Sequence, residues 1–180
     1  AECVLALGFE QMNRGAIVSQ FTDRPSPFDR FDEATQALVG HGEIPLALRY
    51  FGGAGQAHMQ QYGTRLETFA KIRAKASRHA SKNPVALFRD VVTAEDVMNS
   101  PAVWPGVMTR LMACPPTCGA GAAILCTEAF AKRHGISAGV RIRAQAMTTD
   151  TAATFEARDM REVVGFSMAK NAAKKVYEAA

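Results

Sequence analysis

The opening of the chain carries the pattern that most restricts its fold. Residues 3–7 form an unbroken apolar run, Cys-Val-Leu-Ala-Leu, and Gly8 closes it. A short apolar run without alternation is typical of a strand that is buried on both faces. Such a strand needs a neighbour on each edge and a helix on each face. We therefore expect it in the interior of a larger parallel sheet.

The other end of the chain also lacks the usual boundary signals. Apolar positions keep helical spacing from Phe166 to the last residue, Ala180, with no glycine cap and no turn behind them. Both ends therefore indicate an internal segment of a longer protein. The alternative is a short natural chain whose terminal residues are frayed.

Composition bounds the class of protein. The 180 residues are 48% hydrophobic and 21% charged, as in an ordinary globular domain, and no run approaches the roughly 20 apolar residues of a membrane span. A net charge of +4 permits an anionic ligand and does not require nucleic acid. Four cysteines are too few for a disulfide framework and no signal peptide precedes them, which indicates a reducing, cytoplasmic compartment.

Periodicity gives a coarse map of the elements. Residues 120–180 alternate strand, helix, strand, helix, which is an α/β pattern. We predict helices over 44–62, 66–80, 128–134 and 166–180, and strands over 120–126 and 140–147.

The two longest helices before residue 120 have predicted faces. In the first, the apolar face is formed by Ile44, Leu48, Phe51, Gly55, Met59 and Tyr62, and the glycines at 52, 53 and 55 indicate close backbone packing or a break. In the second, the apolar stripe consists of Leu66, Phe69, Ile72, Ala76 and Ala80. A basic face lies beside it, formed by Lys71, Lys75, Arg78 and Lys82.

Capping residues and prolines mark the boundaries between elements. Thr93, with Asp96 three residues later, predicts the start of a short helix, and Thr127 predicts another. Residues 101–105, which hold the only tryptophan, form a predicted turn. Residues 21–32 contain two prolines two residues apart, which excludes a regular helix. We interpret the acids Asp29, Asp32 and Glu33 near this stretch as caps and turn formers.

The chemical signals are weak when they are taken alone. Cys114 and Cys118 have a spacing that a metal allows, but a tetrahedral site needs two more ligands, and Cys126 and His134 are the only near ones. The pattern favours buried thiols instead. The basic face fits a phosphate-rich ligand or a solvated helix surface. No nucleophile with an adjacent base and no phosphate loop is present.

Several long stretches closely resemble the sterol carrier protein type of thiolase, the lipid-transfer-protein thiolase family. The resemblance covers nearly the whole chain. Its clearest parts are AECVLALGFEQM at 1–12, FTDRPSP at 21–27, VMTRLMACPPTCGA at 107–120 and VVGFSMA at 163–169.

The resemblance implies a thiolase-like α/β fold with layers in the order α-β-α-β-α. This chain would be an incomplete internal segment of it. The implied parts are an interior strand and following segment of the N-terminal half at 1–20, the loop domain at 21–117, the last strand and helix of that half at 118–138, and the start of the C-terminal half at 139–180.

The resemblance also implies a reaction, the thiolysis of a 3-oxoacyl-coenzyme A or the reverse Claisen condensation through an acyl-cysteine. Coenzyme A would be a substrate, with no permanently bound cofactor and no metal. The family's nucleophilic cysteine would precede Ala1 and its His-Asp-Cys-Phe, Gly-His-Pro and Cys-x-Gly motifs would follow Ala180, so no catalytic residue is expected in this chain. The residues expected to bind substrate or coenzyme A are Tyr50, Phe51, Gly52, Cys114, Gly119, Gly165 and Phe166.

The same resemblance implies partners and a location, and two rival functions stay open beside it. It implies a homodimer for the full-length protein, acyl-coenzyme A as the bound partner, and a peroxisomal location in a eukaryote. A second reading is a thiolase-fold protein that binds acyl-coenzyme A or another protein without catalysis. A third is a zinc module, which would require stoichiometric zinc at Cys114 and Cys118.

Overall fold

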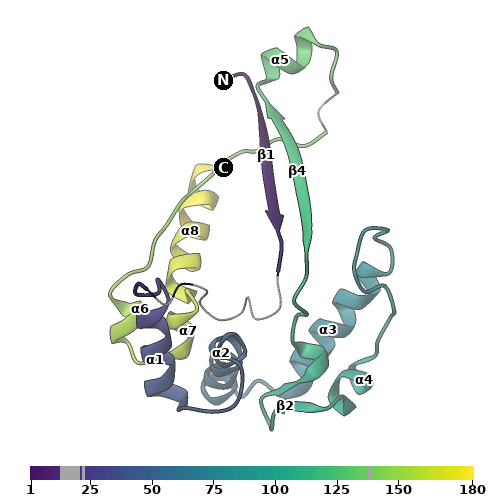
Figure 1. Ribbon diagram of the computed structural model, residues 1–180. Helices are drawn as coiled ribbons and strands as arrows, with labels where there is room; N and C mark the ends of the chain where they lie inside the picture. The colour runs from purple at the N-terminus through teal and green to yellow at the C-terminus, as the bar shows by residue number, and fades with distance from the viewer. Residues whose placement is uncertain (13–20, 22, 138) are drawn as a thin grey trace. The chain divides into compact units, whose positions relative to one another are not determined.

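A computed structural model describes residues 1–12, 21, 23–137 and 139–180. The chain divides into two compact units. The first contains Ala1–Ser26, Pro115–Ala146 and Lys175–Ala180, and the second contains Pro27–Cys114 and Met147–Lys174 (Figure 1). Helices and strands are mixed along the chain, which confirms the α/β class.

The first unit is built on a two-stranded antiparallel ribbon. Strand β1 (Cys3–Glu10) pairs with β4 (Gly119–Cys126), in a register that runs from Cys3 opposite Cys126 to Glu10 opposite Gly119. Both predicted strands are therefore confirmed, although their sequence separation exceeds 100 residues. Long-range pairing of this kind is specified by the apolar pattern and not by a turn.

The burial predicted for β1 is not seen among the described residues, and its place inside a larger sheet stays a prediction. All eight of its residues are exposed, Leu5 to 64%, and within the described residues β4 is its one partner, antiparallel to it. The apolar run predicts a strand correctly, because the β propensity of a segment depends on its own residues. It does not encode what covers the strand, and the described residues do not supply that cover.

A short helix follows the ribbon. Helix α5 (Glu128–Arg133) begins at Thr127, whose hydroxyl accepts a hydrogen bond from the Phe130 N–H at 3.2 Å, and Gly135 follows with φ +64°. The predicted capping is confirmed. The strand predicted over 140–147 is wrong, since these residues have no ladder partner in the described chain and Val140 is 89% exposed.

The second unit is mostly helical. Its elements before residue 115 are α1 (Asp29–Val39), α2 (Leu46–Tyr62), α3 (Leu66–Ala80), α4 (Ala94–Asn99), β2 (Ala102–Trp104), β3 (Met108–Thr109) and the 3-10 helix η1 (Arg110–Met112). After residue 146 it contains α6 (Ala153–Glu156), α7 (Met160–Val163) and the first part of α8 (Phe166–Ala179). The boundaries predicted for a loop domain at 21–117 stay a prediction.

Helix α2 confirms the prediction over 44–62, with Pro45 just before its first turn. Its buried face is not the predicted one. Gly52 and Gly53 are buried, whereas Phe51 and Tyr62 are 67% and 57% exposed. The two buried glycines let neighbouring side chains approach the backbone, so they mark close packing and not a break.

Helix α3 matches its predicted bounds, but its stripe is also displaced. The buried residues are Ala70, Ala74 and Ser77, while Ile72 is 59% exposed. Small residues face the neighbouring α4 and η1, and Arg73 Nε donates to the Leu111 carbonyl at 3.0 Å. Hydropathy places the largest apolar residues inside, but a close helix contact selects the smallest.

The segment after α3 confirms one prediction and corrects another. Thr93 and Asp96 form the predicted capping box at the start of α4. The predicted turn at 101–105 contains strand β2, which pairs with β3 across Gly106. The interpretation of Asp29, Asp32 and Glu33 as turn formers is also wrong, because α1 begins at Asp29 and contains all three.

Candidate functional site

A small apolar cavity in the second unit is the candidate site. Its volume is about 220 Å³. It is lined by Phe28, Phe31, Tyr50, Phe51, Asp150, Val163, Val164, Gly165 and Met168. Ligand pockets usually measure about 300–1,000 Å³, so this cavity can hold only the apolar end of a larger ligand.

One wall of the cavity comes from the start of α1. The rings of Phe28 and Phe31 lie 6.3 Å apart between centroids, and Phe31 also contacts Phe155 edge-on at 5.0 Å. The guanidinium of Arg30 lies 4.2 Å from the centre of the same Phe155 ring. These contacts hold the first turn of α1 against α6, which fixes the aromatic wall.

Tyr50 and Phe51 bring α2 into the lining. The Tyr50 hydroxyl donates a hydrogen bond to Asp32 Oδ1 of α1. Burial and the negative charge of Asp29 raise the pKa of Asp32 above its ordinary value, and the positive charge of Arg49 opposes that shift. This bond ties the Tyr50 ring to α1, so the two aromatic walls keep a fixed separation.

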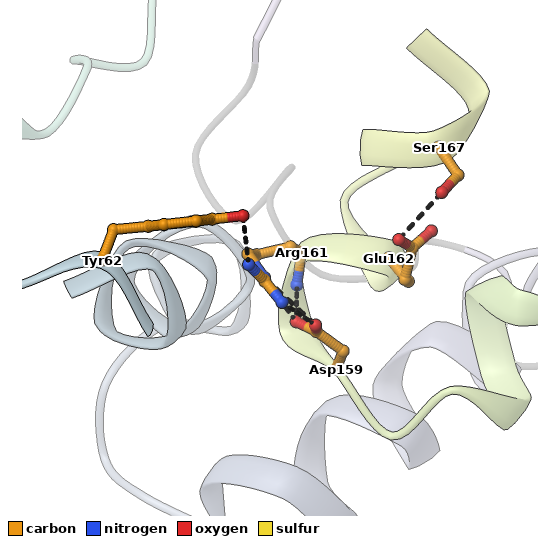
Figure 2. A network of polar contacts seen from close by, with 5 residues as sticks. All are labelled: Tyr62, Asp159, Arg161, Glu162 and Ser167. Carbon is orange, nitrogen blue, oxygen red and sulfur yellow. Dashed lines mark hydrogen bonds and ion pairs between the residues drawn. The ribbon is translucent and has the colours of Figure 1, made fainter. Parts of the chain in front are cut away.

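Polar contacts around α7 position the third wall (Figure 2). Arg161 Nε donates to both carboxylate oxygens of Asp159, at 3.0 and 3.1 Å, and Arg161 Nη1 contacts the Tyr62 hydroxyl at 3.3 Å. The side chains of Arg161 and Asp159 are only 19% and 23% exposed. Hydrogen bonds from Arg161 hold the pKa of Asp159 below its ordinary range, and the Asp159 carboxylate raises the pKa of Arg161.

The link between α7 and α8 gives the cavity its floor. Ser167 Oγ donates to Glu162 Oε1 at 2.9 Å, across Gly165. Gly165 is buried and has φ +85°, a backbone conformation that favours glycine, and a Cβ there would lie 3.0 Å from Met168 Cε. A larger residue at 165 would therefore push into Met168 and reshape the cavity.

The structure brings together three of the seven predicted site residues, Tyr50, Phe51 and Gly165. Gly52 faces Trp104 instead, Phe166 begins α8 at 49% exposure, and neither lines the cavity. Cys114 is exposed outside the lining, and Gly119 belongs to β4 in the first unit. Their predicted binding roles stay predictions.

Sequence reasoning missed several residues of the lining, of which Phe28, Phe31, Met168 and Asp150 matter most. Phe28 and Phe31 stand three residues apart, which places them on one side of a helical turn. That signal was hidden by the prolines before them. Met168 and Asp150 gave no local signal, because only the fold brings residues 147–174 beside α1 and α2.

The exposure of the cysteine thiols differs from what the sequence predicted. Cys114 and Cys118 are exposed, so the prediction of buried thiols is wrong for both. Cys118 Sγ instead lies at the surface, 3.3 Å from the Met12 N–H that donates to it. Among the described residues, no group of three His, Cys, Asp or Glu side chains is placed to hold a metal ion.

Part of the chain is related to thiolases. Over 123 residues, 68% of this chain and 31% of the other, it is 30% identical to "Benzoylsuccinyl-CoA thiolase subunit BbsB" of Thauera aromatica. This similarity and the mixed helices and strands agree with a thiolase-like fold class.

The similarity is greater and longer to a particular kind of relative. The chain is 44% identical to "Sterol carrier protein 2" of Homo sapiens over 179 residues, and 42% identical to the rabbit (Oryctolagus cuniculus) protein of that name over the same length. The chain is thus a homologue of the sterol carrier protein 2 proteins and more distantly of thiolases, which confirms the resemblance read from the sequence.

Two further findings bound that relationship. The alignments cover 99% of this chain but only 32% of each sterol carrier protein 2, so the chain spans about a third of the length of these relatives. No protein-family model matches the chain.

Within the described residues, no helix has the length and apolar character needed to cross a bilayer.

Proposed function

We propose that the second unit binds the acyl end of an acyl-coenzyme A, in a protein whose full length is a thiolase-type acyltransferase. The observation that carries this proposal is the cavity between α1, α2 and the α7–α8 link. Its walls are aromatic and aliphatic, and it is too small for a whole coenzyme. An acyl chain is the part of such a substrate that an apolar cavity of this size suits.

The role of this chain in the reaction is binding and positioning. The cavity lining contains no cysteine and no histidine, so it supplies no thiol nucleophile and no histidine base to the acyl group. The acyl-cysteine chemistry of a thiolase would then use residues outside this chain. Coenzyme A would act as a substrate and not as a resident cofactor, and a homodimer remains an expectation for the full-length protein.

Lipid binding without catalysis is the second candidate function. The absence of a thiol in the lining favours it, and the relatives called sterol carrier protein 2 are named for a lipid cargo. In that case the cavity would take the apolar part of a lipid with no dependence on the coenzyme. The two candidates differ in whether the nucleotide contributes to affinity.

The basic residues of α3 and the turn after it support the coenzyme version. Lys71, Lys75 and Arg78 lie on α3 and Lys82 lies two residues beyond its end; all four are exposed and belong to the same unit as the cavity. Four cations in this segment would attract the phosphates of a coenzyme A, and this attraction would weaken with added salt. A solvated helix face would show no such dependence.

Isothermal titration calorimetry of the whole 180-residue chain tests the proposal with butanoyl-coenzyme A, free coenzyme A and butanoate. Met168→Lys puts a charge into the cavity and should weaken butanoyl-coenzyme A at least about tenfold, because burying an unpaired charge is costly. Met147→Lys is the matched control, since Met147 is 89% exposed and outside the lining. Equal effects of the two variants would refute the assignment of the cavity.

A separate variant tests how much the basic residues contribute to the affinity for coenzyme A. Replacing Lys71, Lys75, Arg78 and Lys82 with glutamine should weaken the binding of butanoyl-coenzyme A and of free coenzyme A together and leave that of butanoate unchanged. Butanoate binding as tight as butanoyl-coenzyme A would instead support lipid binding without the coenzyme. Thiolysis of acetoacetyl-coenzyme A by this chain alone would contradict the binding-only role.

A further inference from the structure

Two cysteines that are far apart in the sequence face each other at one end of the β1–β4 ribbon. Cys3 is directly opposite Cys126 in the antiparallel register. Both are free thiols, Cys3 exposed and Cys126 half-buried. Directly opposite residues in a ladder project to the same face, so both side chains lie on one side of the ribbon.

The hydrogen bonds define the type of this pair. The Thr127 N–H donates to the Glu2 carbonyl at 2.8 Å, which is the bond that flanks a non-hydrogen-bonded position at Cys3 and Cys126. Cα atoms at such a position are about 4.5 Å apart, where side chains approach most closely. Disulfides span Cα separations of about 4.4–6.8 Å, so a bond needs no backbone movement.

The end of the ribbon that carries this pair is anchored. Arg133 of α5 forms a two-pronged ion pair with Glu2, at 2.6 and 3.2 Å, and Thr127 caps α5 immediately after Cys126. These contacts hold residues 2 and 127 in register on the outer side of the pair. The two cysteines are therefore kept close to each other by the structure, although they are far apart in the sequence.

We propose that Cys3 and Cys126 form a reversible cross-strand disulfide and make up a two-cysteine oxidation site for a peroxide. The Cys3 thiol loses its proton and its sulfur attacks one oxygen of hydrogen peroxide; the O–O bond breaks, the leaving hydroxide takes up the proton as water, and a sulfenic acid stays on Cys3. The Cys126 thiol then attacks that sulfur, the S–S bond forms, the S–O bond breaks, and a second water leaves. Two thiols are oxidised and one peroxide is reduced to two waters, and a thiol reductant reverses the bond.

The order of the two steps follows from exposure. Cys3 is exposed and meets the oxidant first, whereas Cys126 is half-buried and resolves the intermediate. Cys114 and Cys118 offer a competing pair four residues apart. They are exposed as well, but two prolines separate them and no ladder holds them opposite each other.

The test uses the whole chain with Cys114→Ser and Cys118→Ser, which leaves only the proposed pair. After treatment with one equivalent of hydrogen peroxide, both remaining thiols should disappear from a thiol titration. Trypsin without reductant should then give a crosslinked species of residues 1–14 and 111–132, which dithiothreitol separates. With Cys126→Ser added, dimedone should label Cys3 and no crosslink should form.

A register control keeps the thiol and moves it by one position. Cys3→Ser with Val4→Cys places the sulfur on the opposite face of β1, so no crosslink to Cys126 should form. Circular dichroism of each variant confirms that the chain is folded. A crosslink of equal yield in this control, a disulfide between two chains, or two unchanged thiols would overturn the proposal, as would a Cys114–Cys118 bond as the main product in the unsubstituted chain.

Discussion

Trp104 packs directly on the backbone of α2 at Gly52. A Cβ at Gly52 would lie 2.8 Å from Cε3 and 3.0 Å from Cζ3 of the indole ring. The glycine therefore has a packing role, next to the two aromatic residues that face the cavity. It also makes the single tryptophan a reporter of this part of α2.

Alanine at Gly52 and at Gly55 should have opposite effects on stability. At Gly52 the added methyl meets the indole, and overpacking of this kind costs about 1–3 kcal/mol of unfolding free energy. At Gly55 the nearest atom is Phe69 Cζ at 3.9 Å, so the helix gains up to about 1 kcal/mol from the better propensity of alanine. Urea unfolding followed by Trp104 fluorescence measures both, and a stabilised Gly52→Ala would contradict the contact.

Gly63 and Gly165 both have positive φ, so alanine at each position strains the backbone. Comparing the two variants distinguishes the cost of that strain from the effect of a changed cavity. At Gly63 (φ +65°) an added Cβ would meet nothing within 4 Å, whereas at Gly165 (φ +85°) it would lie 3.0 Å from Met168 Cε. Gly63→Ala should cost roughly 1–2 kcal/mol from the left-handed backbone alone and leave acyl binding intact. Gly165→Ala should cost more and also weaken butanoyl-coenzyme A, and equal affinities of the two variants would argue against a role for Gly165 in the cavity.

The ion pair of Asp159 and Arg161 makes stability depend on pH. The pKa of Asp159 in the folded chain is held below its ordinary value of 3.8 by hydrogen bonds from Arg161. The unfolded chain therefore takes up this proton first as the pH falls, so the contribution is complete well above pH 3.8 and is lost through and below it. Asp159→Asn should lower the unfolding free energy at pH 7, and the difference from the unsubstituted chain should shrink on acidification.

A double-mutant cycle assigns that effect to the pair. Arg161→Gln and Asp159→Asn should each destabilise the chain at pH 7, and the double variant should lose less than the sum, because the two side chains act on each other. Thermal unfolding between pH 3 and pH 7 follows the dependence. A difference that stays constant down to pH 3 would show that the carboxylate is not the cause.

The ring and the hydroxyl of Tyr50 have separable roles. Tyr50→Phe removes the hydrogen bond to Asp32 and should cost on the order of 1 kcal/mol of stability, since a hydrogen bond is worth about that much. It keeps the aromatic wall, so butanoyl-coenzyme A affinity should change less than about threefold. Tyr50→Ala should reduce the affinity several-fold more, and calorimetry compares the two variants.

Local signals predicted the helices better than their surroundings. The bounds of α3, the capping box at Thr93 and the start of α5 at Thr127 follow from residues within one or two turns, so the sequence sufficed for them. Which face of a helix is buried depends on the partner. Gly52 and Ala74 are buried because Trp104 and α4 come close, and nothing near them in the sequence announces that contact.

The strands and the site show the same limit. Residues 140–147 alternate like a half-buried strand, but alternation specifies a surface and not a partner, and no described strand pairs with them. The resemblance to a family pointed to Tyr50, Phe51 and Gly165, which do line one cavity. It missed Met168 and Phe31, because cavity walls are assembled by tertiary packing of segments that the sequence keeps apart.

Photocrosslinking is the most direct test of acyl binding by the second unit. The reagent is an acyl-coenzyme A with a diazirine near the end of a short acyl chain, and peptide mass spectrometry locates the adducts on the whole chain. We expect adducts within residues 28–51 and 163–168, reduced by excess butanoyl-coenzyme A and by Met168→Lys. Adducts confined to residues 1–12 and 115–146, or adducts that butanoyl-coenzyme A does not reduce, would contradict acyl binding by the second unit.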